Sequence, residues 1–530
     1  MLFTSYEFLV FLAAVFLLYY LLPKRTQWIT LLCASYVFYA LAGVKYLAFI
    51  VFTTLSSFAV ACLMGRVSDR EGRYLADMSD KLSKDEKKAY RAAQKKKRFL
   101  ILSAGLVLNF GVLAVLKYTA FAVVNINSWL HAFGADTTLT IPSLILPLGI
   151  SFYTFQTMGY LIDVYRAKAE PQKNIFKFAL FVSFFPQLIQ GPISRFGDLG
   201  AQLTEAHRFE RKNFTYGMQR VLWGYFKKLV IADRVLVAIN TMIESPDSYR
   251  GFYVFALIIL YSVQIYADFT GGIDITIGIA EALGIKLAEN FKCPFSSRST
   301  KEYWNRWHIT MGSWFTDYVF YPLSICRPMT WISKKSRSLL GKNIGKRVPV
   351  YLATIITWFL TGLWHGAGWN FIVWGLLNCF VILVSRELEP LYARFENRFP
   401  RLHASSAYGA FMCIRTFLLM GLIRSLDCYR NVSLTFKMWG SMFTTFNVAE
   451  ALGGGISTLG LTLVDYVIIL CGCIIMFAVS RAGKEISVRE QLYDKPVLSW
   501  CLFGLLFILI IMFGAYSVGY DASQFIYNQF

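Results

Sequence analysis

Apolar segments close to the length of a membrane-spanning helix recur along almost the whole chain. Crossing the hydrocarbon core of a bilayer takes about 20 residues of α-helix. The clearest segments are Phe8–Leu22, Trp28–Leu41, Tyr46–Met64, Phe99–Val124, Phe252–Ala267, Val348–Leu363, Phe371–Val384, Thr462–Val479 and Leu498–Ala515. Hydrophobic residues make up 56% of the chain, above the roughly 45–50% typical of soluble proteins. We therefore predict an all-α polytopic membrane protein with about eleven transmembrane helices, plus short re-entrant or interfacial helices shielded from lipid.

The charge pattern indicates membrane topology rather than nucleic-acid binding. The formal net charge is +21, but most cations lie in loops between the apolar segments. The stretch Arg66–Arg98 alone carries twelve Lys or Arg residues against six Asp or Glu. Basic loops stay on the cytoplasmic side of a membrane, where anionic lipids also attract them. We predict that the N-terminus and the C-terminal "YDASQFIYNQF" lie outside, and that the first apolar segment is retained as a span rather than removed as a signal peptide.

The chain shows no internal repeat and no soluble domain, so we predict a single membrane domain in three parts. Residues 1–146 hold N-terminal spans with a basic cytoplasmic segment at 66–98. Residues 147–388 form the core that carries the chemistry, and residues 389–530 hold C-terminal spans. Within the basic segment, Lys81–Arg98 is predicted to be a charged helix that continues into the next span.

The centre of the chain differs from the flanking spans. Its apolar stretches at Pro147–Arg195 and Tyr266–Pro322 are broken by Gly, Pro, Asn, Asp and charged residues. Non-helical backbone and ionisable groups are tolerated at membrane depth where protein or water surrounds them. We therefore expect these two segments to be enclosed by protein rather than to face lipid.

Two of the five histidines interrupt apolar or aromatic sequence and are candidate site residues. His365 lies in "FLTGLWHGAGWN", followed by small residues that let a backbone or a substrate approach closely. An ionisable group at membrane depth indicates a functional site. His308 ends "YWNRWH", and on a continuous helix it would share a face with Trp304. For that stretch, a belt of Trp and basic residues at the lipid headgroups explains the pattern equally well. The other three histidines lie in polar surroundings.

The residues around these histidines favour general-base chemistry. Two histidines without a nearby cluster of Cys or carboxylate residues fall short of a catalytic zinc site, and the ten cysteines are scattered. No G-x-S-x-G motif is present. A buried imidazole stays neutral, as a base must be. A hydroxyl that attacks a thioester needs positioning, proton removal and a stabilised oxyanion, and indole N–H groups, Asn305 or backbone N–H groups could supply the last.

Several stretches, in the same order, resemble the membrane-bound O-acyltransferase (MBOAT) superfamily. They are "GISFYTFQTMGYLIDVYR", "FFPQLIQGPISR", "YADFTGGIDITIGIAEALGIKLAENFKCPF", "STKEYWNRWHITMGSWFTDYVFYPL" and "FLTGLWHGAGWNFIVWG". Within the superfamily, the chain is similar to the bacterial branch with alginate O-acetylation proteins, membrane subunits of peptidoglycan O-acetyltransferases and teichoic-acid D-alanyl transfer proteins. Two details differ from that branch, because "SICRP" replaces a Gly-Gly turn after "YVFYPL" and "DFTGGID" replaces "DFSGYSD".

This resemblance implies a fold, a reaction and partners. The family fold is a ring of tilted helices with a cytoplasmic funnel for the acyl donor and an opposite, extracytoplasmic funnel for the acceptor. His365 matches the catalytic histidine of the family, and His308 matches the first motif position. The resemblance further implies a bacterial cell membrane, no bound cofactor, and acetyl-CoA or an acyl-carrier thioester as the donor. An exported polysaccharide would be the acceptor, reached through an extracytoplasmic acyltransferase of the SGNH-hydrolase type.

The resulting hypothesis is acetyl transfer, with His365 as the base or as a transient acyl carrier. His308 would orient or polarise the thioester carbonyl. The chain length, which is closer to the alginate type than to the shorter D-alanyl type, favours acetyl over D-alanyl. A glycan or lipid transporter with broken helices is one rival, and a non-catalytic assembly platform is another. Alginate-like polymers, cellulose, peptidoglycan and teichoic acid all remain open as the acceptor.

Further candidate residues surround the two histidines. Asp268 and Asn290 are candidates for the support of the site or for a funnel, and each would also suit a helix cap. Trp304, Trp307 and Trp364 are candidate walls of the tunnel, and packing against lipid or core explains them equally well.

Overall fold

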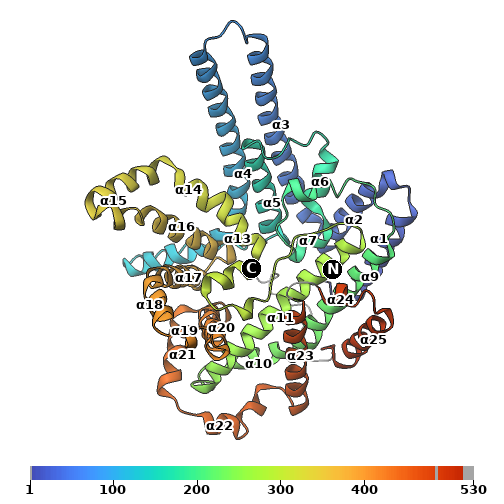
Figure 1. Cartoon of the computed structure of the whole chain (residues 1–530), viewed down its shortest axis with the longest axis vertical. Coiled ribbons are helices and arrows are strands. Elements are labelled where there is room, and N and C mark those ends of the chain that lie inside the picture. The colour runs from blue at the N-terminus through green and yellow to red at the C-terminus, as the bar shows by residue number, and fades with distance from the viewer. Residues whose placement is uncertain (1–2, 484–486, 517–530) are drawn as a thin grey trace. The chain divides into compact units, whose positions relative to one another are not determined.

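The computed structural model describes residues 3–483 and 487–516 (Figure 1). Every regular element in these residues is a helix, and one isolated antiparallel bridge joins Phe291 to Trp307. The α-helices are α1 (Tyr6–Leu21), α2 (Gln27–Ala42), α3 (Leu47–Asp77), α4 (Lys84–Ala132), α5 (Ile150–Tyr165), α6 (Ile175–Ser183), α7 (Phe185–Gln190), α8 (Phe196–Leu199), α9 (Arg211–Tyr225), α10 (Asp233–Glu244), α11 (Phe252–Ala282), α12 (Thr300–Arg306), α13 (Ile309–Phe315), α14 (Tyr321–Ile325), α15 (Arg327–Gly345), α16 (Val348–His365), α17 (Trp369–Glu387), α18 (Glu389–Arg398), α19 (Pro400–His403), α20 (Ser406–Tyr429), α21 (Val432–Thr444), α22 (Val448–Leu452), α23 (Leu463–Ala482), α24 (Val488–Gln491) and α25 (Pro496–Phe513). Two π-helical segments are η3 (Phe226–Ala232) and η5 (Thr316–Phe320), and short 3₁₀ turns are η1 (Lys24–Thr26), η2 (Val44–Tyr46), η4 (Pro294–Ser296) and η6 (Gly455–Leu459). The prediction of an all-α protein is confirmed.

The chain divides into two compact units, and each is described by itself. The first contains the residues up to Thr215 together with Ile279–Leu287. The second contains Tyr216–Gly278 and the residues from Ala288 onward, so it holds both candidate histidines. The sequence analysis divided the chain into three parts by its spans and its candidate site residues. That division stays a prediction. The C-terminal segment expected outside the membrane, residues 520–530, lies outside the described residues.

Long apolar helices confirm a multi-pass membrane protein. Eight helices in the described part of the chain are long and apolar enough to cross a bilayer, namely α3, α4, α11, α16, α17, α20, α23 and α25. Two shorter apolar helical stretches lie at Tyr6–Leu21 and Ile175–Gln190. All the apolar segments named from the sequence lie largely or wholly within helices, whereas α20, which carries buried polar residues, was not among them.

The basic segment continues into a span as predicted. Helix α4 runs for 49 residues without interruption, and its N-cap is Ser83, whose hydroxyl accepts a hydrogen bond from the Glu86 N–H. The Glu86 carboxylate in turn accepts from the Ser83 N–H, which completes a capping box. In Figure 1, α3 and α4 lie side by side as a long pair. The Arg98–Glu71 ion pair at 2.8 Å joins them.

The central segments are enclosed by protein, as expected from their composition. In the first unit, nearly all of α5 and α7 is buried. In the second unit, α11 is apolar enough to span and yet two-thirds of its most apolar window (67%) is buried.

Glycines explain how tightly the second unit packs α11. A Cβ atom at Gly278 would lie 2.5 Å from the carbonyl oxygen of Gly217, and one at Gly224 would lie 2.5 Å from that of Gly271. Only glycine allows two helix backbones to approach this closely. The close contact continues as α9 passes into the π-helical η3, which carries the buried Lys227 and Lys228, because a Cβ atom at Gly271 would lie 3.3 Å from the backbone nitrogen of Lys228.

Candidate active site

His308 lies in a sharp turn between α12 and α13. Its backbone is left-handed, with φ 49° and ψ 52°, and its side chain is 1% exposed. Helix α12 ends at Arg306, and Trp307 is extended and forms the antiparallel bridge with Phe291. The expectation that Trp304 and His308 share one helix face is therefore wrong. The turn breaks the helical period and directs His308 into the interior of the unit.

Asn290 holds this turn in place. Its side-chain oxygen accepts hydrogen bonds from the Thr310 N–H at 3.0 Å and the Thr310 hydroxyl at 2.9 Å, which identifies that atom as the oxygen. The same oxygen lies 3.3 Å from Nδ1 of His308. Nδ1 must then carry the hydrogen, and Nε2 carries the lone pair. Asn290 thus caps α13 and also selects the tautomer of His308.

His308 is neutral at ordinary pH. Burial, followed by the positive charge of Arg424, lowers the pKa of His308 to about 3. The ring of Phe269 packs edge-on against the imidazole, with the two ring centroids 4.9 Å apart. His308 is therefore a buried, neutral hydrogen-bond acceptor at Nε2.

His365 is the last residue of α16 and is half-buried. Its ring lies 4.5 Å from the Trp374 ring and 5.0 Å from the Trp364 ring, centroid to centroid. Trp374 belongs to α17, which folds back on α16 directly after the "HGAG" turn. A Cβ atom at Gly366 would lie 2.1 Å from the Phe371 ring, so the small residue is required for this return.

Trp364 brings the two histidines to one site. Its ring centroid is 5.8 Å from that of His308 and 5.0 Å from that of His365. One imidazole comes from the turn before α13 and the other from the end of α16, and both contact the same indole. The two candidate histidines therefore lie at one aromatic site.

The other aromatic candidates surround these rings. The Trp304 ring lies 4.9 Å from the Trp358 ring and 5.7 Å from the Trp374 ring. The Trp307 ring stacks on Tyr303 at 5.5 Å. Together with Trp364 they form one aromatic cluster around the two histidines. Asn305, in contrast, is exposed on α12, and no described contact joins it to either histidine.

Asp268 belongs to a buried group of charges next to the residue that packs on His308. The Lys228 ammonium lies 2.7 Å from a carboxylate oxygen of Asp268 and 2.7 Å from one of Asp233. All three side chains are at most 1% exposed. Asp268 precedes Phe269, whose ring packs on His308. This buried triad joins η3 and α10 to α11, so it fixes the helix that carries the Phe269 contact.

Three residues of this region were not identified from the sequence: Trp374, Lys228 and Arg424. Arg424 is 6% exposed in α20, and its guanidinium lies 4.7 Å from the Trp307 ring centroid. It interrupts the apolar run "FLLMGLIRSL", and a lone arginine at membrane depth is itself a signal of a functional site. Lys228 interrupts the apolar run "YFKKLVIA" in the same way, whereas Trp374 carries no comparable local signal because its role depends on partners from other elements.

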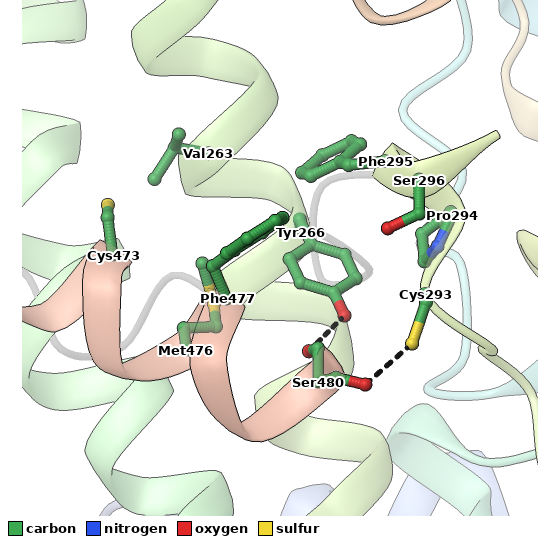
Figure 2. A pocket seen from close by; sticks show the side chains of 10 residues that line it. All are labelled: Val263, Tyr266, Cys293, Pro294, Phe295, Ser296, Cys473, Met476, Phe477 and Ser480. Atoms are coloured by element: carbon green, nitrogen blue, oxygen red, sulfur yellow. Dashed lines mark hydrogen bonds between the residues drawn. The ribbon is translucent and has the colours of Figure 1, made fainter. Parts of the chain in front are cut away.

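An apolar pocket of about 180 Å³ adjoins the aromatic cluster (Figure 2). It is lined by Val263, Tyr266, Cys293, Pro294, Phe295, Ser296, Cys473, Met476, Phe477 and Ser480. The Tyr266 ring also lies 6.1 Å from the Trp307 ring, centroid to centroid. None of the ten lining residues is charged, so the pocket suits a hydrocarbon and offers no cation to a phosphate.

Comparison with known proteins places this site in a family. The sequence model of the membrane-bound O-acyltransferase family (MBOAT) matches residues 172–426, which include both histidines and most of the aromatic cluster. The chain is 32% identical to a Pseudomonas aeruginosa protein named "Probable alginate O-acetylase AlgI", over 85% of this chain and 76% of the relative. The chain belongs to the MBOAT family.

Other relatives agree with this assignment. The chain is 32% identical to the peptidoglycan O-acetyltransferase of Helicobacter pylori, over 72% of this chain and 68% of the relative. It is 28% identical to the teichoic acid D-alanyltransferase of Bacillus subtilis, over 53% of this chain and 70% of the relative. The MBOAT chain described here is therefore an O-acyltransferase, and its relatives match the bacterial branch that the motifs resemble.

In this MBOAT enzyme, replacing Asn290 with alanine is expected to lower the rate of acyl transfer by about 10–100-fold, because His308 would lose the group that holds its position and tautomer. The rate is measured on purified protein and normalised to the amount of folded enzyme. Asn305→Ala serves as the control, since that asparagine is exposed on the neighbouring helix. Equal rates for the two variants would contradict the role assigned to Asn290.

Proposed function

We propose that this enzyme transfers an acetyl group from a cytoplasmic thioester towards a hydroxyl of an exported polysaccharide. The observation that carries the proposal is the pair of imidazoles, His308 and His365, which both contact the ring of Trp364. Two relatives named for O-acetylation support acetyl as the group that is moved. The donor is acetyl-CoA or an acetylated carrier protein, and no bound cofactor is needed.

In this mechanism, His365 is the general base. Its imidazole removes the proton from the attacking hydroxyl as the hydroxyl oxygen bonds to the carbonyl carbon of the thioester. The carbon–sulfur bond then breaks, and the departing thiolate takes the proton from His365. A neutral imidazole is suited to this task, since proton transfer by a positioned base contributes about 10²–10⁴-fold to a rate.

The tautomer set by Asn290 changes the role that we propose for His308. Because Nδ1 donates to Asn290, Nε2 accepts and has no hydrogen to give to a thioester carbonyl. His308 therefore orients a hydrogen-bond donor, either the acceptor hydroxyl or the thiol of the departing carrier. The stabilisation of the oxyanion must come from another group.

The membrane arrangement follows from charge. The basic segment at 66–98 and the loops of the same kind would lie in the cytoplasm of a bacterial cell, next to anionic lipid, with both termini outside. The thioester would enter from a cytoplasmic funnel. The attacking hydroxyl would enter through the opposite funnel, and the acetyl ester formed on it would pass to an SGNH-type acyltransferase, which transfers the acetyl group to the polysaccharide.

A purified-protein experiment tests the reaction itself. Full-length enzyme in proteoliposomes is given radiolabelled acetyl-CoA and a second, unlabelled thiol, and the label on the second thiol is measured. We expect label to move with wild-type enzyme and not with empty liposomes. Transfer from a D-alanyl carrier in place of acetyl-CoA would favour the teichoic-acid type of reaction. No transfer from either donor would favour a transporter or an assembly platform and overturn the proposal.

A further inference from the structure

Arg424 is a buried cation held between the two halves of the active site. Its guanidinium carbon lies 4.7 Å from the Trp307 ring centroid and 5.7 Å from the Trp374 ring centroid. Trp307 directly precedes His308, and the Trp374 ring lies 4.5 Å from that of His365. One arginine therefore contacts the indole next to each histidine.

No carboxylate neutralises this charge at contact distance. Within residues 3–483 and 487–516, no Asp or Glu oxygen lies within the 4.0 Å ion-pair limit of the Arg424 guanidinium. Asp427, one turn further along α20, is near enough to interact electrostatically with Arg424 but does not contact it, and its carboxylate accepts a hydrogen bond from the Tyr261 hydroxyl at 3.0 Å. The contrast with Lys228 is direct, because that buried lysine has two carboxylates at 2.7 Å. A buried charge without a contacting counter-ion is costly unless an anion uses it.

The reaction proposed above generates such an anion. As the hydroxyl oxygen bonds to the carbonyl carbon, the π electron pair of the carbonyl moves onto its oxygen, and it returns when the carbon–sulfur bond breaks. His308 cannot donate a hydrogen bond to that oxygen from Nε2, because its hydrogen is held at Nδ1 by Asn290. Preorganised positive charge that faces such an oxygen is a large term in acyl-transfer catalysis.

We propose that Arg424 is the fixed positive charge of the acyl-transfer site and stabilises the oxygen that becomes negative during attack. The proposal rests on the acyl-transfer function proposed above. The indoles of Trp307 and Trp374 hold the planar guanidinium by cation–π contacts. In this way the charge stays available to the reacting group.

The simplest competing role for Arg424 is structural, as a staple between the two tryptophans. Two substitutions separate the roles. Arg424→Met keeps an unbranched side chain that packs between the indoles but removes the charge. Arg424→Lys keeps the charge and loses the planar fork. Arg415→Met is the matched control, because Arg415 lies on the same helix and its guanidinium donates a hydrogen bond to the Arg298 carbonyl oxygen at 3.1 Å.

The experiment measures kcat, KM for acetyl-CoA and the melting temperature of each full-length variant in the thiol-transfer assay. We expect Arg424→Met to lower kcat by about 100-fold or more, with little change in KM or melting temperature. Arg424→Lys should retain more of kcat than Arg424→Met, and Arg415→Met should match wild type. A wild-type kcat for Arg424→Met overturns the proposal. Equal losses of kcat and folded protein in both Arg424 variants also overturn it, since that result identifies a staple.

These outcomes are distinct from a failure of the proposed function. If wild-type enzyme transfers no acetyl group, the function itself is wrong. If wild type transfers acetyl and Arg424→Met does so equally well, only the role of Arg424 is wrong.

Discussion

Replacing His365 with alanine is expected to lower acetyl transfer by about 10²–10⁴-fold, the range for loss of a general base. The side chain ends α16 and is half-buried against Trp374 and Trp364, so its removal leaves the α16–α17 contact made by Gly366 and Phe371 intact. The loss should therefore appear in catalysis, while the amount of protein in the membrane stays near wild type.

The measurement compares wild type, His365→Ala and His131→Ala in the thiol-transfer assay and in the O-acetyl content of envelope polysaccharide. His131 is an exposed histidine near the end of α4, so its replacement controls for the loss of an imidazole elsewhere. Wild-type transfer by His365→Ala, at equal abundance, would exclude the base role and leave His365 as a packing residue.

Replacing Lys228 with methionine is expected to have the largest effect on folding. The ammonium bridges Asp233 and Asp268 at 2.7 Å, and all three side chains are buried. Removing one partner of a buried ion pair costs about 3–5 kcal/mol, because the remaining charge keeps its desolvation cost. Here two carboxylates of the same sign would face each other. We expect a strongly lowered melting temperature in detergent and little mature protein in the membrane.

Two further variants make this prediction specific. Lys437→Met removes a lysine that pairs with Asp247 at 3.0 Å, where both side chains are more than half exposed, so the melting temperature should hardly change. The triple variant Lys228→Met, Asp233→Asn, Asp268→Asn removes all three charges and should recover much of the lost stability. If Lys228→Met melts like Lys437→Met, the triad does not support the core.

The two candidate histidines show which features of the site could be predicted from local sequence. His365 follows an apolar stretch and precedes glycines, so its place at the end of a span was predictable. His308 was identified as a candidate, but its conformation was not. A helical period was expected through Trp304–His308, and the left-handed turn arises from Asn290, a residue well before it in the chain. No short-range pattern contains that hydrogen bond.

The buried charged residues near the site were also predictable only in part. Asp268 was a candidate on residue type alone, yet its partner Lys228 lies in a π-helical segment on another element. Arg424 was not identified from the sequence although it interrupts an apolar run, and its role depends on Trp307, in the turn after α12, and on Trp374 of α17.

The sequence by itself determined the helical class, the multi-pass membrane character, the continuation of the basic segment into a span and the two histidine motifs. Each of these depends on hydropathy, capping or spacing within a few turns of one segment. Only the tertiary structure decided the tautomer of His308, the contact of both imidazoles with Trp364 and the buried position of Arg424. Those features depend on hydrogen bonds, ring contacts and buried charges between helices that are distant in sequence, and such contacts form only when the whole unit packs.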